Sequence, residues 1–161
     1  MLIAVISDSH NNEKAINIIK EYINNADVLL FLGDGEEDIG KIKESFKGEV
    51  YAVNGNCDMY SKNPDELLLN FEGKKIFMCH GHKYNVKYSY NNIYYRGKEL
   101  DADIVLFGHT HIPIIEVNDN MIMMNPGSIS RGAAMSGQSM GYIEIEKGEQ
   151  PISYIKEVRH K

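Results

Sequence analysis

The sequence predicts an α/β protein in which two β-sheets pack face to face and helices cover their outer sides. In the first half of the chain, continuous apolar runs alternate with helical patterns, as buried parallel strands do in such folds. After Pro113 the runs become short and alternating, which is typical of antiparallel strands. A length of 161 residues with 43% hydrophobic residues fits one domain with a single core, and we expect that domain to span residues 1–161.

The first half of the chain reads as a βαβαβ unit. Three strands alternate with two helices, which are expected at residues 2–7, 12–24, 27–32, 37–46 and 49–53. Ile16, Ile19 and Ile23 lie at helical spacing in the first of these helices and form an apolar stripe that would cover a sheet face. Strands joined by crossover helices run parallel, so these three strands should form a parallel sheet.

The second half adds further strands and one helix. Two runs read as a hairpin that turns at Glu72-Gly73, at residues 67–71 and 74–79. A helix near 91–101 and a strand at 103–108 follow, and they would continue the first sheet. Four short runs come next, at residues 114–117, 121–124, 141–146 and 152–158. Turn-forming residues separate these runs, so we expect them to form an antiparallel second sheet.

Composition and charge narrow the classes of function. The formal net charge is -6 and the pI is near 5.5, so no general attraction to a nucleic-acid backbone is expected. The opening MLIAVIS is too short and lacks the basic flank of a signal peptide, and no run approaches the roughly 18 apolar residues that span a bilayer. We expect a cytoplasmic protein whose partners include neither membranes nor long nucleic acids. Cys57 and Cys79 lack CxxC spacing, which argues against a disulfide framework and a thiolate zinc site.

Seven side chains that can bind metal ions follow five of the apolar runs, and this is the strongest functional signal in the sequence. They are Asp8, His10, Asp34, Asn56, His80, His109 and His111. Buried strands of α/β sheets place ligand sites just beyond their carboxyl ends, which is where these residues lie. In extended backbone, residues two apart point to the same side, so Asp8 could bind one ion together with His10. His109 and His111 repeat that spacing.

The donor atoms indicate the kind of metal. Carboxylate oxygen, amide oxygen and imidazole nitrogen suit Mn, Fe, Zn, Co or Ni better than a soft metal or calcium. Seven ligands are too many for one zinc-like ion. Two divalent ions about 3.5–4 Å apart, sharing one carboxylate, would use all of them, and such pairs catalyse displacement at phosphorus.

Five short motifs together resemble those of the calcineurin-like metallophosphoesterases. In chain order they are Asp8-x-His10, Gly33-Asp34, Gly55-Asn56-Cys57-Asp58, His80-Gly81-His82 and Gly108-His109-Thr110-His111. The small size, Cys57 and the Asn125-Pro126-Gly127-Ser128 loop resemble in particular the compact YfcE-type phosphodiesterases. The resemblance covers nearly the whole chain. It implies a four-layer α/β/β/α sandwich of two mixed β-sheets flanked by helices.

The resemblance also implies a ligand set and a reaction. One ion would be bound by Asp8, His10, Asp34 and His111, and the other by Asp34, Asn56, His80 and His109, with Asp34 as the bridge. Manganese is expected first, with Ni, Co, Zn, Fe or Mg as alternatives. A hydroxide bound between the two ions would attack the phosphorus of a small phosphodiester, nucleotide derivatives among them. Asp58 would fix neighbouring groups of the site.

One residue departs from the superfamily pattern. Many members have a histidine at the position of Cys57, and that histidine touches the phosphate and protonates the leaving group. A thiol is a weaker donor, so activated or cyclic diesters should be favoured, with His82 as a substitute proton donor. We expect Asn56, Cys57 and His82 to contact the substrate, and Arg131 to pair with a substrate phosphate. The catalytic residues are then Asp34, Asn56, Asp58, Cys57 and His82.

Other functions remain open on the same residues. The site could serve a phosphomonoesterase, a protein phosphatase or a nuclease, although the acidic charge disfavours a nuclease and the chain is short for a protein phosphatase. A non-catalytic scaffold is a further alternative, because the retromer coat contains a subunit with this fold. A homo-oligomer is compatible with the sequence. The tyrosines between residues 84 and 95 could pack against a helix, form an oligomer contact or stack on a nucleobase.

Overall fold

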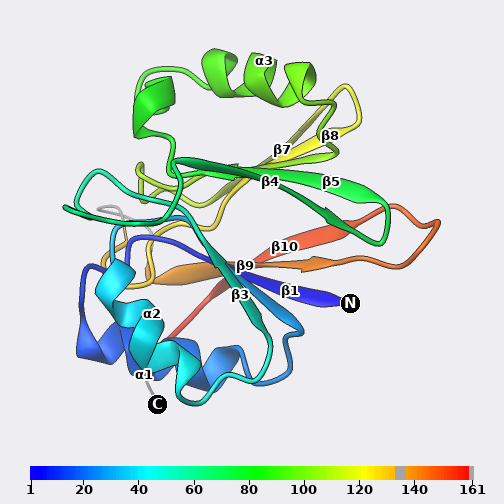
Figure 1. The fold of residues 1–161 in the computed structure, drawn as a ribbon. Helices are drawn as coiled ribbons and strands as arrows, with labels where there is room; N and C mark the ends of the chain where they lie inside the picture. Colours follow the sequence, from blue (N-terminus) through cyan, green and yellow to red (C-terminus); the bar gives the residue numbers. More distant parts are fainter. Residues whose placement is uncertain (133–136, 160–161) are drawn as a thin grey trace.

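The computed structural model describes residues 1–132 and 137–159, which form two mixed β-sheets packed face to face (Figure 1). The first sheet has the strand order β10-β9-β1-β2-β3. Its strands are β1 (Leu2–Ile6), β2 (Val28–Phe31), β3 (Glu49–Ala52), β9 (Ser139–Glu144) and β10 (Ile152–Glu157). β1, β2 and β3 run parallel, as predicted, and β9 pairs antiparallel with β1.

The second sheet has the strand order β4-β5-β6-β8-β7. Its strands are β4 (Glu66–Phe71), β5 (Lys74–Cys79), β6 (Ile104–Leu106), β7 (Ile114–Asn118) and β8 (Met121–Asn125). β4 and β5 form the predicted hairpin, whereas β5, β6 and β8 run parallel to one another. The two sheets therefore both mix parallel and antiparallel pairs.

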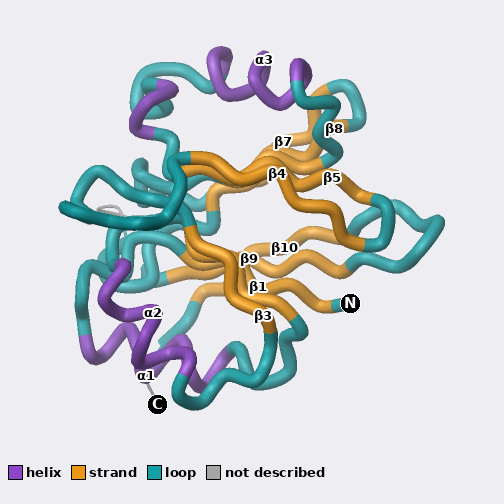
Figure 2. Tube along the Cα trace, viewed as in Figure 1, coloured by secondary structure: helices purple, strands orange, loops and turns teal. Residues whose placement is uncertain are grey.

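The helices lie outside the two sheets and complete four layers. α1 (Glu13–Tyr22) and α2 (Glu36–Lys43) cover the outer face of the first sheet, and α3 (Asn91–Glu99) covers the second. Figure 2 shows the same separation, with the helices above and below the paired strands. A short 3-10 helix, η1 (His82–Tyr84), follows β5 and was not predicted. The expected α/β/β/α architecture is confirmed.

Three apolar clusters hold these layers together. The central cluster lies between the sheets and includes Ile3, Leu30 and Met78. A second cluster joins α1 and α2 to the first sheet, and the isoleucines predicted for the first helix belong to it. A third cluster joins α3 to the second sheet around Phe77 and Phe107. Because each layer buries its own apolar face, the strand ends above these clusters are fixed in position.

The predicted assignment of strands to sheets was wrong in two respects. The hairpin and the strand at 104–106 do not continue the first sheet; they build the second one. The four C-terminal runs do not form a sheet of their own, because β7 and β8 join the second sheet and β9 and β10 join the first. β8 and β9 are buried along almost their whole length, so each takes a place inside a sheet rather than at an edge. Burial on both faces decides this placement, and short alternating runs do not reveal it.

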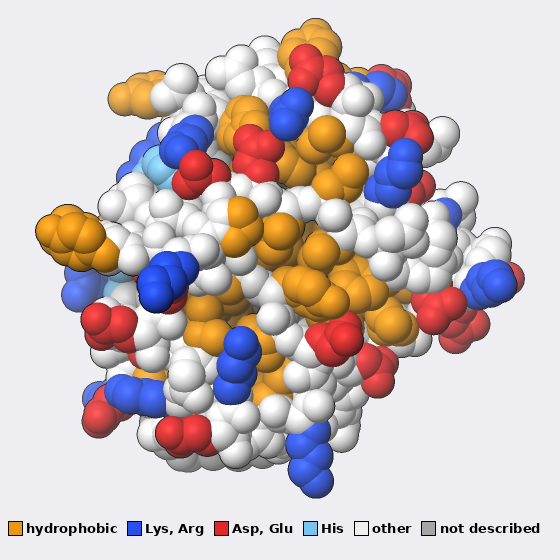
Figure 3. All heavy atoms as spheres, in the orientation of Figure 1, with side chains coloured by type: hydrophobic (Ala, Val, Ile, Leu, Met, Phe, Trp, Pro, Cys, Tyr) orange, Lys and Arg blue, Asp and Glu red, His pale blue; other side chains and the backbone are white. Residues whose placement is uncertain are grey.

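The edge between β3 and β4 leaves part of the central cluster accessible. Half-buried Tyr51 on β3 and half-buried Leu67 and Leu69 on β4 pack against this cluster. Figure 3 shows hydrophobic side chains exposed in the middle of this face. No helix in the described part of the chain combines the length and the apolar character that a bilayer crossing requires.

Candidate metal centre

The seven predicted ligands meet at one end of the sandwich. Three of them follow β1 and β2, which belong to the first sheet, and three follow β5 and β6 of the second. The seventh, Asn56, follows β3. Parallel strands of both sheets end at this edge, so loops that are far apart in the sequence converge there. Each of the seven side chains lies within 4.0 Å of another member of the set.

One group of donors gathers around Asp8, which is buried between the sheets. His111 Nε2 lies 3.0 Å from Asp8 Oδ1, and His10 Nε2 lies 3.8 Å from the same oxygen. The two imidazole nitrogens of His10 and His111 are 3.4 Å apart. Two imidazoles and a carboxylate that aim at a common point form a donor set typical of a divalent transition-metal site.

A second group gathers around His80, which is also buried. Its Nε2 lies 3.0 Å from Asn56 Oδ1, 3.4 Å from Asp34 Oδ2 and 3.2 Å from His109 Nδ1. Its other ring nitrogen lies 2.7 Å from the carbonyl oxygen of Leu32. A carbonyl accepts a hydrogen bond, so Nδ1–H donates to Leu32, and Nε2 is the atom available to a metal ion.

Asp34 and Asp8 connect the two groups. His80 Nε2 lies 4.0 Å from Asp8 Oδ1, and Asp8, Asp34 and His80 together form a cluster of potential ligands within the described residues. Both carboxylates are almost completely buried. Buried carboxylates are costly unless they are paired, hydrogen-bonded or bound to a cation. The donor set and its burial therefore fit divalent cations.

The backbone at this centre is not extended, which corrects the geometry expected for the two paired motifs. Five of the seven predicted ligands have positive φ angles: 57° at Asp8, 50° at His10, 59° at Asp34, 68° at His109 and 60° at His111. Non-glycine residues seldom adopt this left-handed conformation. The strands end at Ile6 and Leu106, before the ligands, so the side chains converge through tight turns. Strain of this kind gathers at functional sites because the surrounding structure must hold it.

Burial and neighbouring charges shift the pKa values of these groups. Burial raises the pKa of Asp34, but hydrogen bonding and attraction from His80 outweigh burial, and the pKa falls well below its usual range. Burial lowers the pKa of His80, yet the hydrogen bond to Asp34 and the charge of Asp8 raise it overall. Burial and repulsion from His80 lower the pKa of His109 to about 4, which leaves that imidazole neutral at pH 7. A neutral imidazole can bind a cation without losing a proton.

Asp58 holds the loops that carry Asp34 and Asn56. Its carboxylate accepts four backbone N–H groups, from Asp34 at 2.8 Å, Gly35 at 2.8 Å, Glu36 at 3.0 Å and Gly55 at 2.9 Å. Two of these bonds reach each carboxylate oxygen. The N–H groups come from the loops after β2 and after β3, so one side chain joins both loops. The supporting role of Asp58 stays a prediction, for which these four contacts are the structural basis.

Close backbone packing explains why glycines stand beside the ligands. A Cβ atom at Gly55 would lie 2.1 Å from Asp34 Oδ1 and 2.3 Å from Asp34 N. At Gly108 it would lie 1.9 Å from Ser7 Oγ. Neither side chain fits, because both contacts are far shorter than van der Waals distance. Gly55 thus allows two loops of the first sheet to approach each other, and Gly108 allows a loop of the second sheet to approach the end of β1.

The loop at residues 125–131 stabilises the turns that carry several predicted ligands through hydrogen bonds. Asn125 Nδ2 donates to the carbonyl oxygen of Gly108 at 2.8 Å and to Thr110 Oγ1 at 3.0 Å, which fixes the turn between the two histidines. The hydroxyl groups of Ser128 and Ser130 donate to the carbonyl oxygen of Asp8, at 2.9 Å and 2.8 Å. The loop thus positions ligands from both sheets.

Sequence reasoning missed a second positioning carboxylate. Asp38 is buried and its Oδ2 accepts from Ser9 Oγ at 2.5 Å and from Asn11 N at 3.0 Å, which brackets His10 on both sides. Burial raises the pKa of Asp38. Its other oxygen is buried without a partner among the described residues. An aspartate in the first turn of a helix is typical of an ordinary helix start, so no pattern in the sequence indicated this role.

The residues predicted to contact the substrate lie at different places around the rim of the centre, which is the exposed border of the seven predicted ligands. Cys57 is exposed, its N–H donates to Asp34 Oδ1 at 2.8 Å, and its sulfur belongs to a potential ligand cluster with His10 and Asp34. Partial desolvation and the nearby Asp34 raise the pKa of the thiol to about 11, so it is neutral at pH 7. His82 lies beside His80, with ring centroids 5.4 Å apart. Arg131 lines a separate pocket next to His10 and His111.

His82 is poorly suited to the role of substitute proton donor. Burial and repulsion from His80 lower its pKa, so the imidazole is largely unprotonated at neutral pH. Its Nδ1 is buried and lacks a hydrogen-bond partner in the part of the chain that the structure describes. The nearby tyrosines mostly pack rather than face the centre, with Tyr84 against Phe77 and Tyr90 against Phe107.

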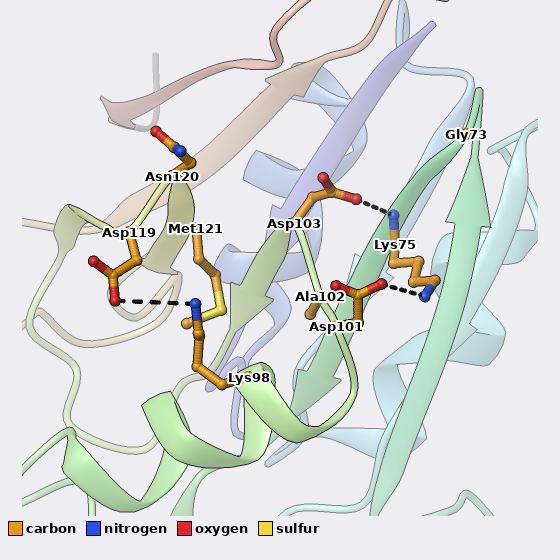
Figure 4. A pocket seen from close by; sticks show the side chains of 9 residues that line it. All are labelled: Gly73, Lys75, Lys98, Asp101, Ala102, Asp103, Asp119, Asn120 and Met121. Carbon is orange, nitrogen blue, oxygen red and sulfur yellow. Dashed lines mark hydrogen bonds and ion pairs between the residues drawn. The ribbon is translucent and has the colours of Figure 1, made fainter.

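Another pocket lies at the opposite end of the second sheet, and none of the seven predicted ligands lines it. It measures about 300 Å³ and lies where β5, β6 and β8 begin (Figure 4). Lys75 Nζ pairs with Asp101 at 2.8 Å, and Lys98 Nζ lies 3.9 Å from Asp119. Asp103 accepts the backbone N–H of Lys75 at 2.8 Å. Its charged groups already have partners, so we do not place the chemistry there.

Comparison with known sequences identifies a family for this chain. The family model described as the calcineurin-like phosphoesterase superfamily domain matches residues 1–148. A probable metallophosphoesterase of Bacillus subtilis, YsnB, is 35% identical over 156 residues, covering 96% of this chain and 90% of the relative. Phosphodiesterase YfcE of Escherichia coli is 30% identical over 121 residues, covering 66% of this chain and 50% of the relative.

One solved structure with a similar fold is not named as a phosphoesterase. Vacuolar Protein Sorting 29 from Cryptosporidium parvum superposes with a TM-score of 0.83, covering 98% of this chain and 91% of that chain. The sequence identity is 20%, so this likeness concerns the fold alone. Fold and function are separable, and the function has to be argued from the site.

Replacing Asp58 by Asn tests how the loops of the centre are held. The amide NH2 would face two N–H donors, so two of the four hydrogen bonds would be lost. The free energy of unfolding, measured in urea, should therefore fall by about 2–4 kcal/mol. Affinity for a divalent cation, measured by chelator competition, should fall about 10- to 100-fold. Asp101→Asn, at an exposed ion pair, serves as the control and should change neither value. A D58N protein with the stability and metal affinity of the wild type would contradict this role.

Proposed function

The chain belongs to the calcineurin-like phosphoesterase superfamily, and from this premise we propose that it is a phosphodiesterase that uses two divalent cations to hydrolyse small phosphodiesters. The relatives named metallophosphoesterase and phosphodiesterase support a phosphoric ester hydrolase. The observation that carries the proposal is the convergence of buried carboxylates, imidazoles and an amide from five loops.

The seven side chains divide into two sets that share Asp34. Asp8, His10 and His111 form one set together with the Asp34 carboxylate. Asn56, His80 and His109 form the other set with the same carboxylate. Asp34 Oδ2 faces His80 at 3.4 Å, and its Oδ1 accepts the N–H of Cys57. The carboxylate is therefore held from both sides before any cation binds. This preorganisation supports the role of bridging ligand.

Manganese is the cation that we propose first, with Ni, Co, Zn, Fe and Mg as alternatives. Nitrogen and oxygen donors without a charged thiolate suit this series of borderline and hard ions. Two such cations would activate water for in-line attack on phosphorus and neutralise charge on its oxygens. The residues of the chain do the remaining work, which is to fix the donors and to offer hydrogen bonds at the rim.

Departure of the leaving group is the step for which the site offers least help. Cys57 stands at the rim with a thiol whose pKa is raised to about 11, so it can donate a hydrogen bond but is a weak acid. The lowered pKa of His82 makes it a poor reservoir of protons at neutral pH. We infer that diesters with good leaving groups, or strained cyclic diesters, are the better substrates.

Two other functions are weaker on the same observations. A phosphomonoesterase or nuclease would use the same centre, but the net charge of -6 disfavours binding of long nucleic acid. A scaffold would share the fold with Vacuolar Protein Sorting 29. It would gain nothing from two buried carboxylates held beside four imidazoles, because such groups cost stability unless a ligand compensates them.

Metal removal and replacement test the reaction class. Chelator-treated protein should lose hydrolysis of bis(4-nitrophenyl) phosphate, and Mn should restore it more fully than Ni, Co, Zn or Mg. The diester should be hydrolysed faster than 4-nitrophenyl phosphate under the same conditions. A faster monoester reaction would assign the centre to a phosphomonoesterase. Absence of turnover together with absence of tight metal binding would favour the scaffold.

The variant Cys57→His tests the role of the rim thiol. An imidazole can protonate the leaving group, so hydrolysis of diesters with poor leaving groups should rise by up to about 100-fold, while activated diesters change little. The measurement is the slope of log kcat/KM against leaving-group pKa, which should become shallower. Cys57→Ala is the control, because it removes the thiol without supplying an imidazole. An unchanged slope in C57H would refute the proposed deficiency.

A further inference from the structure

A polar pocket adjoins the metal centre on one side only. It measures about 270 Å³ and is lined by His10, Asn12, His111, Ser130 and Arg131. His10 and His111 also belong to the donor set around Asp8, so the pocket opens directly beside that set. Asn56, Cys57 and His82 do not line it. A substituent of a bound diester could therefore extend into this pocket without approaching the rim thiol.

Arg131 is held in place by the same hydrogen bonds that position Asp8. Its backbone N–H donates to Ser128 Oγ at 2.9 Å, and that hydroxyl donates to the carbonyl oxygen of Asp8 at 2.9 Å. Ser130 Oγ donates to the same carbonyl at 2.8 Å. The backbone of residue 131 is thus only two hydrogen bonds away from a proposed metal ligand. An exposed arginine on such an anchor is better defined in position than one on an unsupported loop.

Within residues 1–132 and 137–159, the charge of Arg131 has no carboxylate partner, unlike that of the other two arginines. Arg96 pairs with Glu66 and Glu99, and Arg159 pairs with Glu157. Among the described residues, no carboxylate lies within ion-pair distance of the Arg131 guanidinium. In a protein of net charge -6, a guanidinium without a carboxylate partner beside a candidate catalytic centre favours an anionic ligand.

The remaining lining also favours an anion. The side-chain oxygen of Asn12 accepts the N–H of Lys14 at 3.0 Å, which orients the amide and leaves its NH2 able to donate to a ligand. The pocket has no acidic side chain in its lining. Donors and a guanidinium surround a space large enough for a phosphate or carboxylate group.

We propose that this pocket is a subsite for a second anionic group, and that the natural substrate is a phosphodiester with a phosphate or carboxylate on one of its two substituents. The inference rests on the proposed function, in which the scissile phosphodiester lies at the metal centre. Arg131 then determines specificity by binding the second group, and it takes no part in bond breaking. The reaction remains the addition of water to one diester, with release of an alcohol and a monoester.

A matched pair of substrates tests the subsite. The first is thymidine 5′-(4-nitrophenyl phosphate), and the second is the same compound with a 3′-phosphate. Wild-type protein should show a KM about tenfold lower for the phosphorylated compound, which corresponds to about 1.4 kcal/mol from one charge-assisted pair. In Arg131→Gln the two KM values should become equal. Arg159→Gln removes the same charge from an arginine that pairs with Glu157 and does not line the pocket, so it should keep the wild-type ratio.

A binding measurement separates this inference from the proposed function. Calorimetric titration of the protein with thymidine 3′,5′-bisphosphate and with thymidine 5′-monophosphate requires no turnover, and the bisphosphate should bind about tenfold more tightly unless Arg131 is replaced. Equal affinities in the wild type, or an advantage that survives in R131Q, would overturn the subsite while leaving the phosphodiesterase intact. Loss of turnover for both thymidine diesters, with this affinity difference present, would refute the proposed function and keep the anion subsite.

Discussion

The contact between Asp34 and His80 is the constraint on which the site depends. Asp34 follows the second strand of one sheet, His80 follows the second strand of the other, and Asp34 Oδ2 lies 3.4 Å from His80 Nε2. His80 Nδ1 also lies 2.7 Å from the carbonyl oxygen of Leu32, in the loop that carries Asp34. Both side chains are buried, and the opposite charges raise one pKa and lower the other. The sheets can therefore meet at this end only in an arrangement that keeps these groups paired.

The centre combines several features that cost stability, and the surrounding packing compensates for them. Five left-handed ligand residues, buried carboxylates and glycines without room for a side chain all occur within these loops. Each strained non-glycine residue costs on the order of 1 kcal/mol or more. Asp58, Asp38 and the serines of the loop at 125–131 hold the strained turns by accepting or donating hydrogen bonds to the backbone. Preorganised donors are what a metal site requires, because a loose site loses affinity and selectivity.

The sequence indicated the candidate ligands because they stand at the ends of strongly apolar runs, and such runs can be recognised from the local sequence alone. All ten strands and three α-helices were expected close to where they lie within the described residues. The sheet to which each strand belongs was not predicted correctly, because β8 and β9 owe their central places to contacts with strands distant in the sequence. The left-handed turns at Asp8 and His109 were not expected either, because residue spacing alone predicted extended backbone there. Asp38 could not be found because its partners, Ser9 and Asn11, lie on another loop.

The most direct test of the central claim is the spin state of the manganese-loaded protein, combined with elemental analysis. If Asp34 bridges two ions, wild-type protein should bind two manganese ions per chain, and its electron paramagnetic resonance spectrum should show exchange coupling between them. Asp34→Asn should weaken or abolish that coupling while the apolar clusters, which do not include this residue, keep the fold intact. A single ion per chain, or two ions without coupling in the wild type, would contradict a bridged dinuclear centre.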